Sequence, residues 1–277
     1  MTEKMEGPSI LLLIPAYNEE ERIGPVLREY AKYFKEHYAG EFNIVVVLNG
    51  CEDDTLGVVK TAQKEHSEIR YLNYEEPIGK GGALIEGLHH FHEANYDYIG
   101  YVDADGATQP PAFHDLIKHC READCVIGSR WLPGSVIHQP QESRRRFASR
   151  CFHVLVQTLF WMSIKDTQCG AKLIRREAIE AVLSHLALAD MAFDINLLYS
   201  LKKKGFTILE IPTEWTDKIG TKVVLGKTSL VMFLSVVRLR IIYSFIYKHI
   251  EFILSPFSEW IYKCLAAPHR KFKGHES

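Results

Sequence analysis

The sequence predicts an α/β protein with a doubly wound, mostly parallel sheet flanked by helices. Continuous apolar runs at 9–17 and 42–50 are typical of strands that are buried on both faces. Each run is followed by a segment of helical composition, and this strand–helix alternation continues to residue 130. The 277 residues are enough for one large domain of this class, or for one domain with an appendage.

The alternation predicts the individual elements in order. Strands are expected at 9–17, 42–50, 69–75, 96–105 and 124–130, and helices at 19–38, 52–66, 79–94 and 110–123. After residue 130 the pattern changes. A helix with a basic start is expected at 141–164, a turn, a short strand and a helix within 166–183, and a helix followed by a strand within 190–215.

Composition and charge exclude some classes of partner. The formal net charge is -2, so there is no excess of positive charge to suggest nucleic-acid binding. The six cysteines are scattered without a C-x-x-C pair, and the N-terminal segment does not have a signal-peptide pattern. We therefore expect reduced thiols. The 13 histidines show no spacing typical of a metal site.

The C-terminal region 227–266 is apolar but interrupted. Arg238 and Arg240 divide its first segment, and an arginine at the centre of a membrane span costs about 2.5–3.5 kcal/mol. Aromatic and basic residues occur together here and in 251–274, as they do in helices that lie in a membrane interface. We expect 227–277 to form amphipathic interfacial helices and a basic tail. The alternative is packing on the domain or at a dimer contact.

Polar stretches follow each expected strand, and in a parallel sheet the carboxyl ends of the strands form the ligand-binding edge. Asp103 and Asp105 follow the apolar run YIGYV, one residue apart. Such a pair serves either a turn or a hard divalent cation, which is usually held by one or two carboxylates plus substrate phosphates. The glycine-rich turn 79–82 would offer N–H groups to an anion, with Lys80 adding charge. Together with Glu19, these features indicate a site for a nucleotide diphosphate and a divalent metal.

Seven motifs occur in an order that resembles a known family. They are IPAYNEE, GKGGA, DADGAT, GSR, DTQCGAKL, AFDINLL and WTDKIGTK. The resemblance is to the inverting family 2 glycosyltransferases of the GT-A fold, and within them to the polyprenyl-phosphate branch. It covers residues 9–245, and DADGAT, DTQCG and RLRIIYS are most similar to the enzymes that transfer glucose to dolichyl phosphate.

The resemblance implies a role for each matching residue. Asp103 and Asp105 would bind Mg²⁺ or Mn²⁺. Asp194 falls where many members of the wider family have the general base, so all three are candidate catalytic residues. The residues expected to line the nucleotide-sugar pocket are Pro15, Tyr17, Glu19, Asn49, Lys80, Asp103 and Lys222. Those expected at the phosphate of the acceptor lipid are Arg130, Arg145 and Ser149.

The resemblance also implies the reaction and the domain organisation. A hexose, with glucose favoured, would pass with inversion from a UDP-sugar to a polyprenyl or dolichyl phosphate. The GT-A catalytic domain would be 1–226, with a nucleotide-sugar half at about 9–130 and an acceptor half at about 131–226. Eukaryotic members have an N-terminal anchor that this sequence does not show. Attachment to the cytoplasmic face of a membrane, peripheral or monotopic, is therefore expected through 227–277, and a homo-oligomer is compatible with the sequence.

Some features leave alternatives open. The turn after the second strand is Leu48-Asn49-Gly50-Cys51, where relatives often have Asp-Asp-Gly-Ser. Asn49 or Asp53 would substitute at the base, and the choice between uridine and guanosine stays open. Asp166 either caps the turn before Gln168 or belongs to the site. The alternatives for function are a family 2 transferase with a non-lipid sugar acceptor, a sugar-1-phosphate nucleotidyltransferase, and a non-catalytic nucleotide-sugar binding module.

Overall fold

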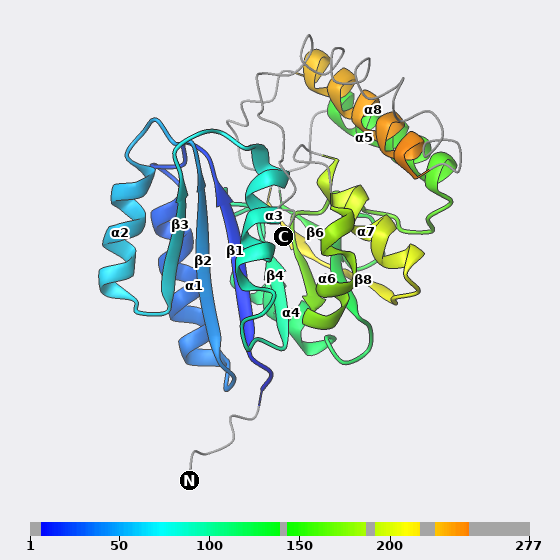
Figure 1. Cartoon of the computed structure of the whole chain (residues 1–277). Coiled ribbons are helices and arrows are strands. Elements are labelled where there is room, and N and C mark those ends of the chain that lie inside the picture. Colours follow the sequence, from blue (N-terminus) through cyan, green and yellow to red (C-terminus); the bar gives the residue numbers. More distant parts are fainter. Residues whose placement is uncertain (1–6, 139–142, 187–191, 217–224, 244–277) are drawn as a thin grey trace.

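The computed structural model describes residues 7–138, 143–186, 192–216 and 225–243, except for the side chains at 143–149, 151 and 225–231 (Figure 1). Within these residues a seven-stranded sheet has the order β3-β2-β1-β4-β7-β5-β8. Its strands are β1 (Ile10–Ala16), β2 (Phe42–Asn49), β3 (Ile69–Tyr74), β4 (Tyr98–Tyr101), β5 (Cys125–Ser129), β7 (Lys172–Arg175) and β8 (Ile208–Pro212).

The sheet is mixed, because β7 is inserted antiparallel between β4 and β5. The remaining pairs, β1 with β2 and β4, β2 with β3, and β5 with β8, are parallel. A second sheet of two short parallel strands, β6 (Val136–Ile137) and β9 (Glu214–Trp215), lies beside the main one. The predicted mostly parallel α/β sheet is confirmed. The direction of β7 and the β6–β9 pair were not predicted.

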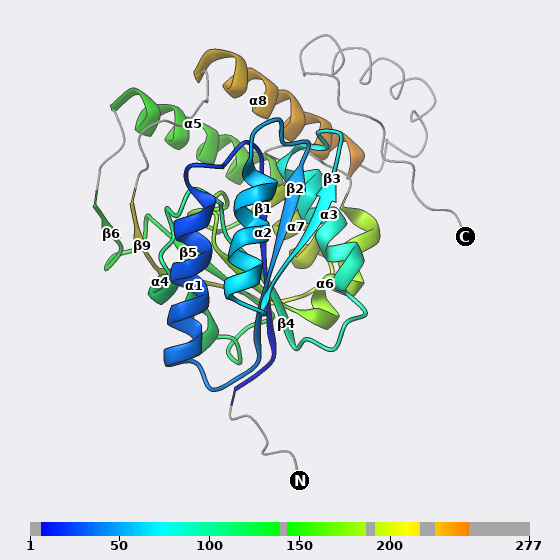
Figure 2. The ribbon, with the colours of Figure 1, turned by 90° about the vertical axis from the view of Figure 1, so that its left-hand side faces the viewer.

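Helices cover both faces of the sheet, as Figures 1 and 2 show. The core on one face includes side chains of α1 (Ile23–His37), α2 (Thr55–Glu65) and α4 (Pro110–Lys118). The core on the other face includes side chains of α3 (Gly79–Phe91), α6 (Arg176–Val182), the short 3-10 helix η1 (Leu183–His185) and α7 (Phe193–Lys203). The two remaining helices, α5 (Ser143–Phe160) and α8 (Leu225–Ile242), pack against each other beyond the carboxyl ends of the parallel strands.

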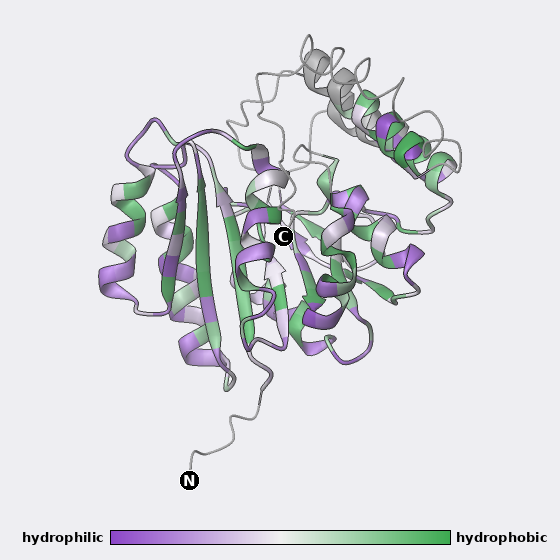
Figure 3. Ribbon diagram, in the orientation of Figure 1, coloured by the Kyte–Doolittle hydropathy of each residue, from purple (hydrophilic) through white to green (hydrophobic). Residues whose placement is uncertain are grey.

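Strand β1 explains why the buried strands are continuously apolar. Alternate side chains point to opposite faces of a strand. Ile10 and Leu12 pack in the core that contains α1 and α4, whereas Leu11 and Leu13 pack in the core that contains α3 and α7. Because both faces are covered, neither set can be polar. The apolar colouring of the central strands in Figure 3 follows from this arrangement.

Two helices begin later than the sequence predicts. α1 begins at Ile23 rather than at residue 19, and α2 begins at Thr55 rather than at residue 52. The residues in front of them are held in loops: the N–H of Glu19 donates to Thr55 Oγ1 (2.8 Å), and the N–H of Asp54 donates to a Glu20 carboxylate oxygen (2.8 Å). These contacts join the two loops at the carboxyl edge and keep their residues out of the helices.

The described part of α8 is partly built into the domain. Val236 and Leu239 are buried in the core that α7 shares, and Tyr243 just beyond the helix shares a hydrogen bond with Ser200 of α7 (Oη–Oγ 2.6 Å). No helix among the described residues is long and apolar enough to cross a membrane. The segment 251–274 lies outside the described residues. The interfacial role of this region and the division of the chain at residue 226 stay predictions.

Replacing Gly100 of β4 by alanine should destabilise the fold. An added Cβ would lie 2.6 Å from Phe113 Cζ and 2.7 Å from the Lys172 carbonyl oxygen. Overpacking of this kind costs about 1–3 kcal/mol. Urea denaturation should show the loss. Gly128→Ala is the matched control, because its nearest neighbours would be 3.3 Å away. Equal stability changes in the two variants would contradict the expectation.

Candidate active site

The loops that follow β1 and β2 interlock at the carboxyl edge of the sheet. Asn18 has a positive φ of 53°, which asparagine tolerates, and its side-chain oxygen accepts the N–H of Glu52 (2.8 Å). Asp53 accepts the N–H groups of Glu20 (3.2 Å) and Thr55 (3.0 Å). These reciprocal hydrogen bonds fix the two loops, which form one wall of the site, without an external ligand.

Glu19 and Tyr17 occupy different positions in this wall. The Glu19 carboxylate accepts two hydrogen bonds from Arg22, from Nε (2.6 Å) and Nη2 (2.7 Å), so it already has a cationic partner. Tyr17 is 48% exposed and Pro15 is half-buried at the end of β1. Both therefore lie at the edge where a nucleotide is expected.

Asn49 holds the glycine-rich turn in place. It is the last residue of β2, and its side-chain oxygen accepts the N–H groups of Ile78 (2.6 Å) and Gly79 (3.1 Å). Gly50 has a φ of 62°, and any Cβ there would strike the backbone of Pro77. The N–H group of Gly79, the first of the turn, is therefore bound internally, which modifies the expectation that this group faces an anion.

Lys80 connects the glycine-rich turn to the aspartate pair. Its Nζ lies 2.5 Å from Asp103 Oδ1. Burial favours the neutral amine, but the carboxylates of Asp103 and Asp194 outweigh it and raise the Lys80 pKa above its ordinary value. The lysine is therefore fully charged at neutral pH, and one positive charge is fixed beside the two aspartates.

Asp105 is bonded within the turn that follows β4. Its Oδ1 accepts the N–H of Ala107 (2.9 Å), which fixes the turn after β4, and burial together with the nearby Asp103 raises the Asp105 pKa. The turn is further fixed by Tyr30 of α1, whose hydroxyl donates to the Thr108 carbonyl oxygen (2.9 Å). Two close carboxylates in a partly buried place repel each other, and a cation between them would relieve this repulsion.

The donor set at the aspartates fits a hard divalent cation. Among the described residues there is no group of three or more Asp, Glu, His or Cys side chains that could hold a metal by themselves. Mg²⁺ is usually bound through one or two carboxylates and substrate phosphates, so Asp103 and Asp105 suffice when a diphosphate supplies the other oxygens. A metal that arrives with the nucleotide fits this arrangement.

Asp194 is part of a buried charge network. It lies in the first turn of α7, and its Oδ1 accepts hydrogen bonds from Lys172 Nζ (2.5 Å) and the Tyr101 hydroxyl (2.5 Å). Lys172 is completely buried and also donates to the Cys169 carbonyl oxygen (2.7 Å). Burial alone would raise the Asp194 pKa, but Lys172 and then Lys80 lower it. Asp194 is thus held as a paired carboxylate, which favours a positioning role over that of a proton acceptor.

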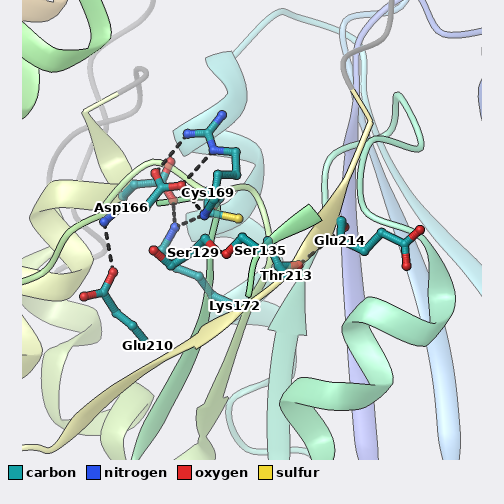
Figure 4. Close-up of polar contacts among 10 residues, drawn as sticks. Ser129, Ser135, Asp166, Cys169, Lys172, Glu210, Thr213 and Glu214 are labelled. Carbon is teal, nitrogen blue, oxygen red and sulfur yellow. Dashed lines mark hydrogen bonds and ion pairs between the residues drawn. The ribbon is translucent and has the colours of Figure 1, made fainter. Parts of the chain in front are cut away.

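Arg130 follows β5 and makes a two-pronged ion pair with Asp166. Its Nε and Nη2 donate to the two carboxylate oxygens (2.7 and 2.9 Å), and its backbone N–H donates to one of them (2.9 Å). The guanidinium also lies 5.2 Å from the ring centroid of Trp215. Figure 4 shows Asp166 bound on its other side, where its N–H donates to Glu210 (2.9 Å). Burial opposes the charge of Asp166, but Arg130 lowers the Asp166 pKa.

The structure brings together most of the predicted site residues that it describes. Lys80, Asp103, Asp105 and Asp194 form one electrostatic cluster, and Arg130 is close enough to Asp103 for the two charges to interact. Lys222 lies outside the described residues. Arg145 and Ser149 lie on α5, but their side chains are outside the described part. Their roles stay predictions.

Sequence reasoning missed Lys172, Tyr101 and Gly170. A lysine inside the expected short strand of DTQCGAKLIRR was a usable signal, because a charge among buried apolar residues needs a partner. Tyr101 looked like an ordinary aromatic residue of a strand. Gly170 could not be singled out, because its closeness to Asp103 arises from the packing of β4 against the segment before β7.

A family model for glycosyl transferase family 2 matches residues 11–183. The matched range begins in β1 and ends at η1, and it contains the aspartate pair and the turn after residue 166. The chain belongs to glycosyl transferase family 2. This glycosyltransferase assignment confirms the predicted enzyme class, and it decides against a sugar-1-phosphate nucleotidyltransferase.

Curated relatives support the assignment over most of this glycosyltransferase. It is 32% identical to the dolichyl-phosphate beta-glucosyltransferase of Dictyostelium discoideum, covering 84% of this chain and 74% of that protein. It is 30% identical to the same enzyme of Saccharomyces cerevisiae, covering 88% and 78%. Identity to glycosyltransferase AglD of Haloferax volcanii is 31% over 82% of this chain, but the match spans only 36% of that longer protein.

Solved structures support the fold. Glucosyl-3-phosphoglycerate synthase of Mycobacterium tuberculosis, in complex with Mn²⁺, UDP-glucose and phosphoglyceric acid, matches with a TM-score of 0.61 and 17% identity over 84% of this chain and 80% of that one. The same enzyme with Mg²⁺ and UDP matches with a TM-score of 0.62, 17% identity and coverages of 84% and 79%. The glycosyltransferase therefore has the α/β fold of these GT-A enzymes.

Replacing Lys172 by methionine should leave the buried Asp194 without its main partner. Removing one member of a buried ion pair costs about 3–5 kcal/mol. Asp194 has a lowered pKa in the native protein, so its contribution is complete above the unfolded pKa, about 4, and is lost only below it. In the Lys172→Met variant the pKa of Asp194 should rise above its value in the unfolded chain. The free energy of unfolding should therefore fall as the pH increases from about 5 to about 8.

Urea denaturation at several pH values measures this effect. The double variant Lys172→Met with Asp194→Asn is the control, because the amide is neutral and can still accept from Tyr101. It should recover most of the stability and show no such pH dependence. A single variant as stable as the native protein across this range would be inconsistent with the pair's proposed weight.

Proposed function

We propose that this enzyme transfers a hexose, with glucose favoured, from a UDP-sugar to a polyprenyl or dolichyl phosphate. The observation that carries the proposal is the placement of two kinds of phosphate-binding chemistry at one sheet edge. The aspartate pair with Lys80 follows β4, and the Arg130 guanidinium follows β5. The names of relatives in Dictyostelium discoideum and Saccharomyces cerevisiae give the lipid and the sugar their support.

The donor half would hold the nucleotide sugar by its diphosphate. Asp105 with Asp103 would hold Mg²⁺ or Mn²⁺, which when bound neutralises the charge that develops on the departing diphosphate. Lys80 supplies a further fixed positive charge beside them. Asn49 shapes the glycine-rich turn, and Tyr17 lies exposed at the end of β1 for contact with the nucleotide. UDP occurs in the solved structures with this fold, which supports uridine as the base.

The acceptor half would orient the lipid phosphate. A guanidinium matches phosphate oxygens geometrically, and Arg130 directs two of its five N–H donors at Asp166, so others can reach a phosphate. Arg145 and Ser149 are predicted to complete this site from α5. A phosphate oxygen attacks the anomeric carbon, a new carbon–oxygen bond forms, and the bond to the diphosphate breaks with its electrons leaving on UDP.

This reaction does not need a strong general base. The second pKa of a phosphate monoester is near 6, so the acceptor is mostly a dianion at neutral pH. The hydrogen bonds of Asp194 agree with a reaction that needs no general base, because a carboxylate held by Lys172 and Tyr101 is a poor proton acceptor. Asp194 would instead help to place Lys80 and the sugar.

We further propose that the enzyme works at the cytoplasmic face of a membrane through α5, α8 and the chain beyond them. Large apolar side chains are exposed on and next to these helices: Val154 (60%), Trp161 (83%), Phe233 (43%) and Ile241 (37%). Exposed apolar side chains near basic residues are typical of interfacial helices. A transferase with a soluble sugar acceptor, which would use these helices as a packing or oligomer surface, is the competing outcome.

Replacing Asp105 by alanine should lower metal-dependent transfer strongly. Loss of electrostatic stabilisation at a developing charge lowers the turnover number by about 10²–10³-fold. The measurement is release of UDP from UDP-glucose with a short-chain polyprenyl phosphate, at several Mn²⁺ concentrations in detergent. Asp115→Ala on α4 is the control, because Asp115 is exposed and pairs only locally with Lys118. Full activity of the Asp105 variant would refute the metal assignment.

Replacing Val154 by aspartate should weaken binding to liposomes in a flotation assay. A charge placed on the apolar surface of an interfacial helix must lose hydration or leave the membrane. Val136→Asp is the matched control, because Val136 is also an exposed valine (49%) but lies on β6 and not on either of the two helices. If the native protein does not float, the acceptor is not presented by a membrane through these helices.

A further inference from the structure

One short turn contacts both halves of the proposed active site. The turn comprises residues 166–170, Asp166-Thr167-Gln168-Cys169-Gly170, and it enters the antiparallel strand β7. Asp166, Thr167 and Cys169 are buried. Its first residue binds Arg130, and its last residue lies against Asp103. The following inference rests on the proposed function, since it concerns how these two side chains are placed.

The first end of the turn fixes the Arg130 side chain. Both carboxylate oxygens of Asp166 accept hydrogen bonds from Arg130, two from its guanidinium and one from its backbone N–H. The backbone at Asp166 is itself fixed, because the carboxylate of Glu210 on β8 accepts hydrogen bonds from the N–H groups of Lys165 (2.8 Å) and Asp166 (2.9 Å). The guanidinium is thus clamped between Asp166 and the Trp215 ring.

The other end of the turn provides space for the Asp103 carboxylate. A Cβ on Gly170 would lie 2.2 Å from Asp103 Oδ2 and 2.7 Å from its Cγ. The other oxygen, Oδ1, is already held by Lys80 at 2.5 Å. A side chain at position 170 would therefore displace the Asp103 carboxylate from its place beside Lys80. Glycine at this position leaves space for a side chain of the site.

The middle of the turn is fixed to the buried charge network. The Cys169 carbonyl oxygen accepts a hydrogen bond from Lys172 Nζ (2.7 Å), as Figure 4 shows, and the same amine binds Asp194. The turn is thus held by hydrogen bonds at Asp166 and Cys169, and its last residue, Gly170, lies against Asp103.

We propose that Asp166 and Gly170 are positioning residues of the transfer reaction. Asp166 presents the Arg130 guanidinium to the acceptor phosphate, and Gly170 leaves the space in which the Asp103 carboxylate faces the metal and the donor diphosphate. The separation between the two reacting partners is then set by five consecutive residues.

The Asp166 arm is tested with Asp166→Asn, which keeps the shape of the side chain and removes its charge. The dissociation constant of citronellyl phosphate, a short soluble polyprenyl phosphate, should rise about 10- to 100-fold, as expected for a lost charge-assisted bond. Binding of Mn²⁺ in the presence of UDP should not change. Calorimetry measures both. If this variant does not fold, Asp166→Glu, which keeps the charge but moves it by one methylene, should give a smaller rise.

Asp124→Asn is the matched control for this arm. Asp124 precedes β5 at its opposite end, where its carboxylate accepts hydrogen bonds from Thr207 (2.9 and 2.7 Å) and pairs with Arg175 (3.2 Å). It therefore loses a comparable carboxylate far from the carboxyl edge. A similar loss of lipid-phosphate binding in both variants would show a general effect on stability and would overturn the role of Asp166.

The Gly170 arm is tested with Gly170→Ala. The displaced Asp103 carboxylate should weaken Mn²⁺ binding in the presence of UDP about tenfold or more, a loss of about 1.4 kcal/mol. Citronellyl phosphate binding should be unaffected. Gly87→Ala on α3 is the control, because its Cβ would crowd Leu13 in the core (3.0 Å) without touching a carboxylate. Native Mn²⁺ affinity in Gly170→Ala, or equal losses in both variants, would overturn the role of Gly170.

The outcomes separate this inference from the proposed function. A native protein that binds Mn²⁺, UDP and citronellyl phosphate but transfers no sugar would refute the proposed function. The binding measurements on the variants would still decide the roles of Asp166 and Gly170. A native protein that does not bind citronellyl phosphate would refute the proposed function and the Asp166 arm together. The Gly170 arm would still be decided by Mn²⁺ affinity alone.

Discussion

The ion pair between Lys172 and Asp194 is the interaction on which the site depends. A fully buried amine is costly unless it is paired and hydrogen-bonded, and here Asp194 and the Cys169 carbonyl oxygen meet that need. The pair joins the middle of the sheet to the first turn of α7, and its field reaches Lys80. The charged residues at the carboxyl edge therefore continue a series of buried charges. The signs alternate from Lys172 through Asp194 and Lys80 to Asp103.

The residues for the donor and those for the acceptor are separated by one antiparallel strand, β7. β4 delivers the aspartate pair and β5 delivers Arg130, but they are not neighbours, because β7 lies between them. Being antiparallel, β7 starts at the carboxyl edge, so its preceding turn lies between the two groups. A parallel strand in that place would have ended at this edge, and a helix or long crossover would have had to follow it.

Much of this architecture was predictable from the sequence, and the remainder has physical reasons for escaping it. The runs around Ile14 and Val46 are apolar because both sheet faces are covered, so periodicity identifies them directly. The convergence of Lys80 and Asp103 follows from parallel strands sharing an edge. Strand direction at β7 and the close approach of Gly170 depend on tertiary packing. Hydrophobic pattern contains neither kind of information.

The buried lysine of β7 also has a consequence for how the chain finds its pairing during folding. β7 has only four residues, two of which, Leu173 and Ile174, are apolar and belong to opposite faces. Hydrophobicity alone would tolerate a slip by one residue. Such a slip would turn Lys172 to the opposite face of the sheet, which is lined by Phe113. Lys172 and Asp194 would then each be a buried charge without its partner. The charge thus discriminates against misaligned sheets that a strand of leucine and isoleucine would accept.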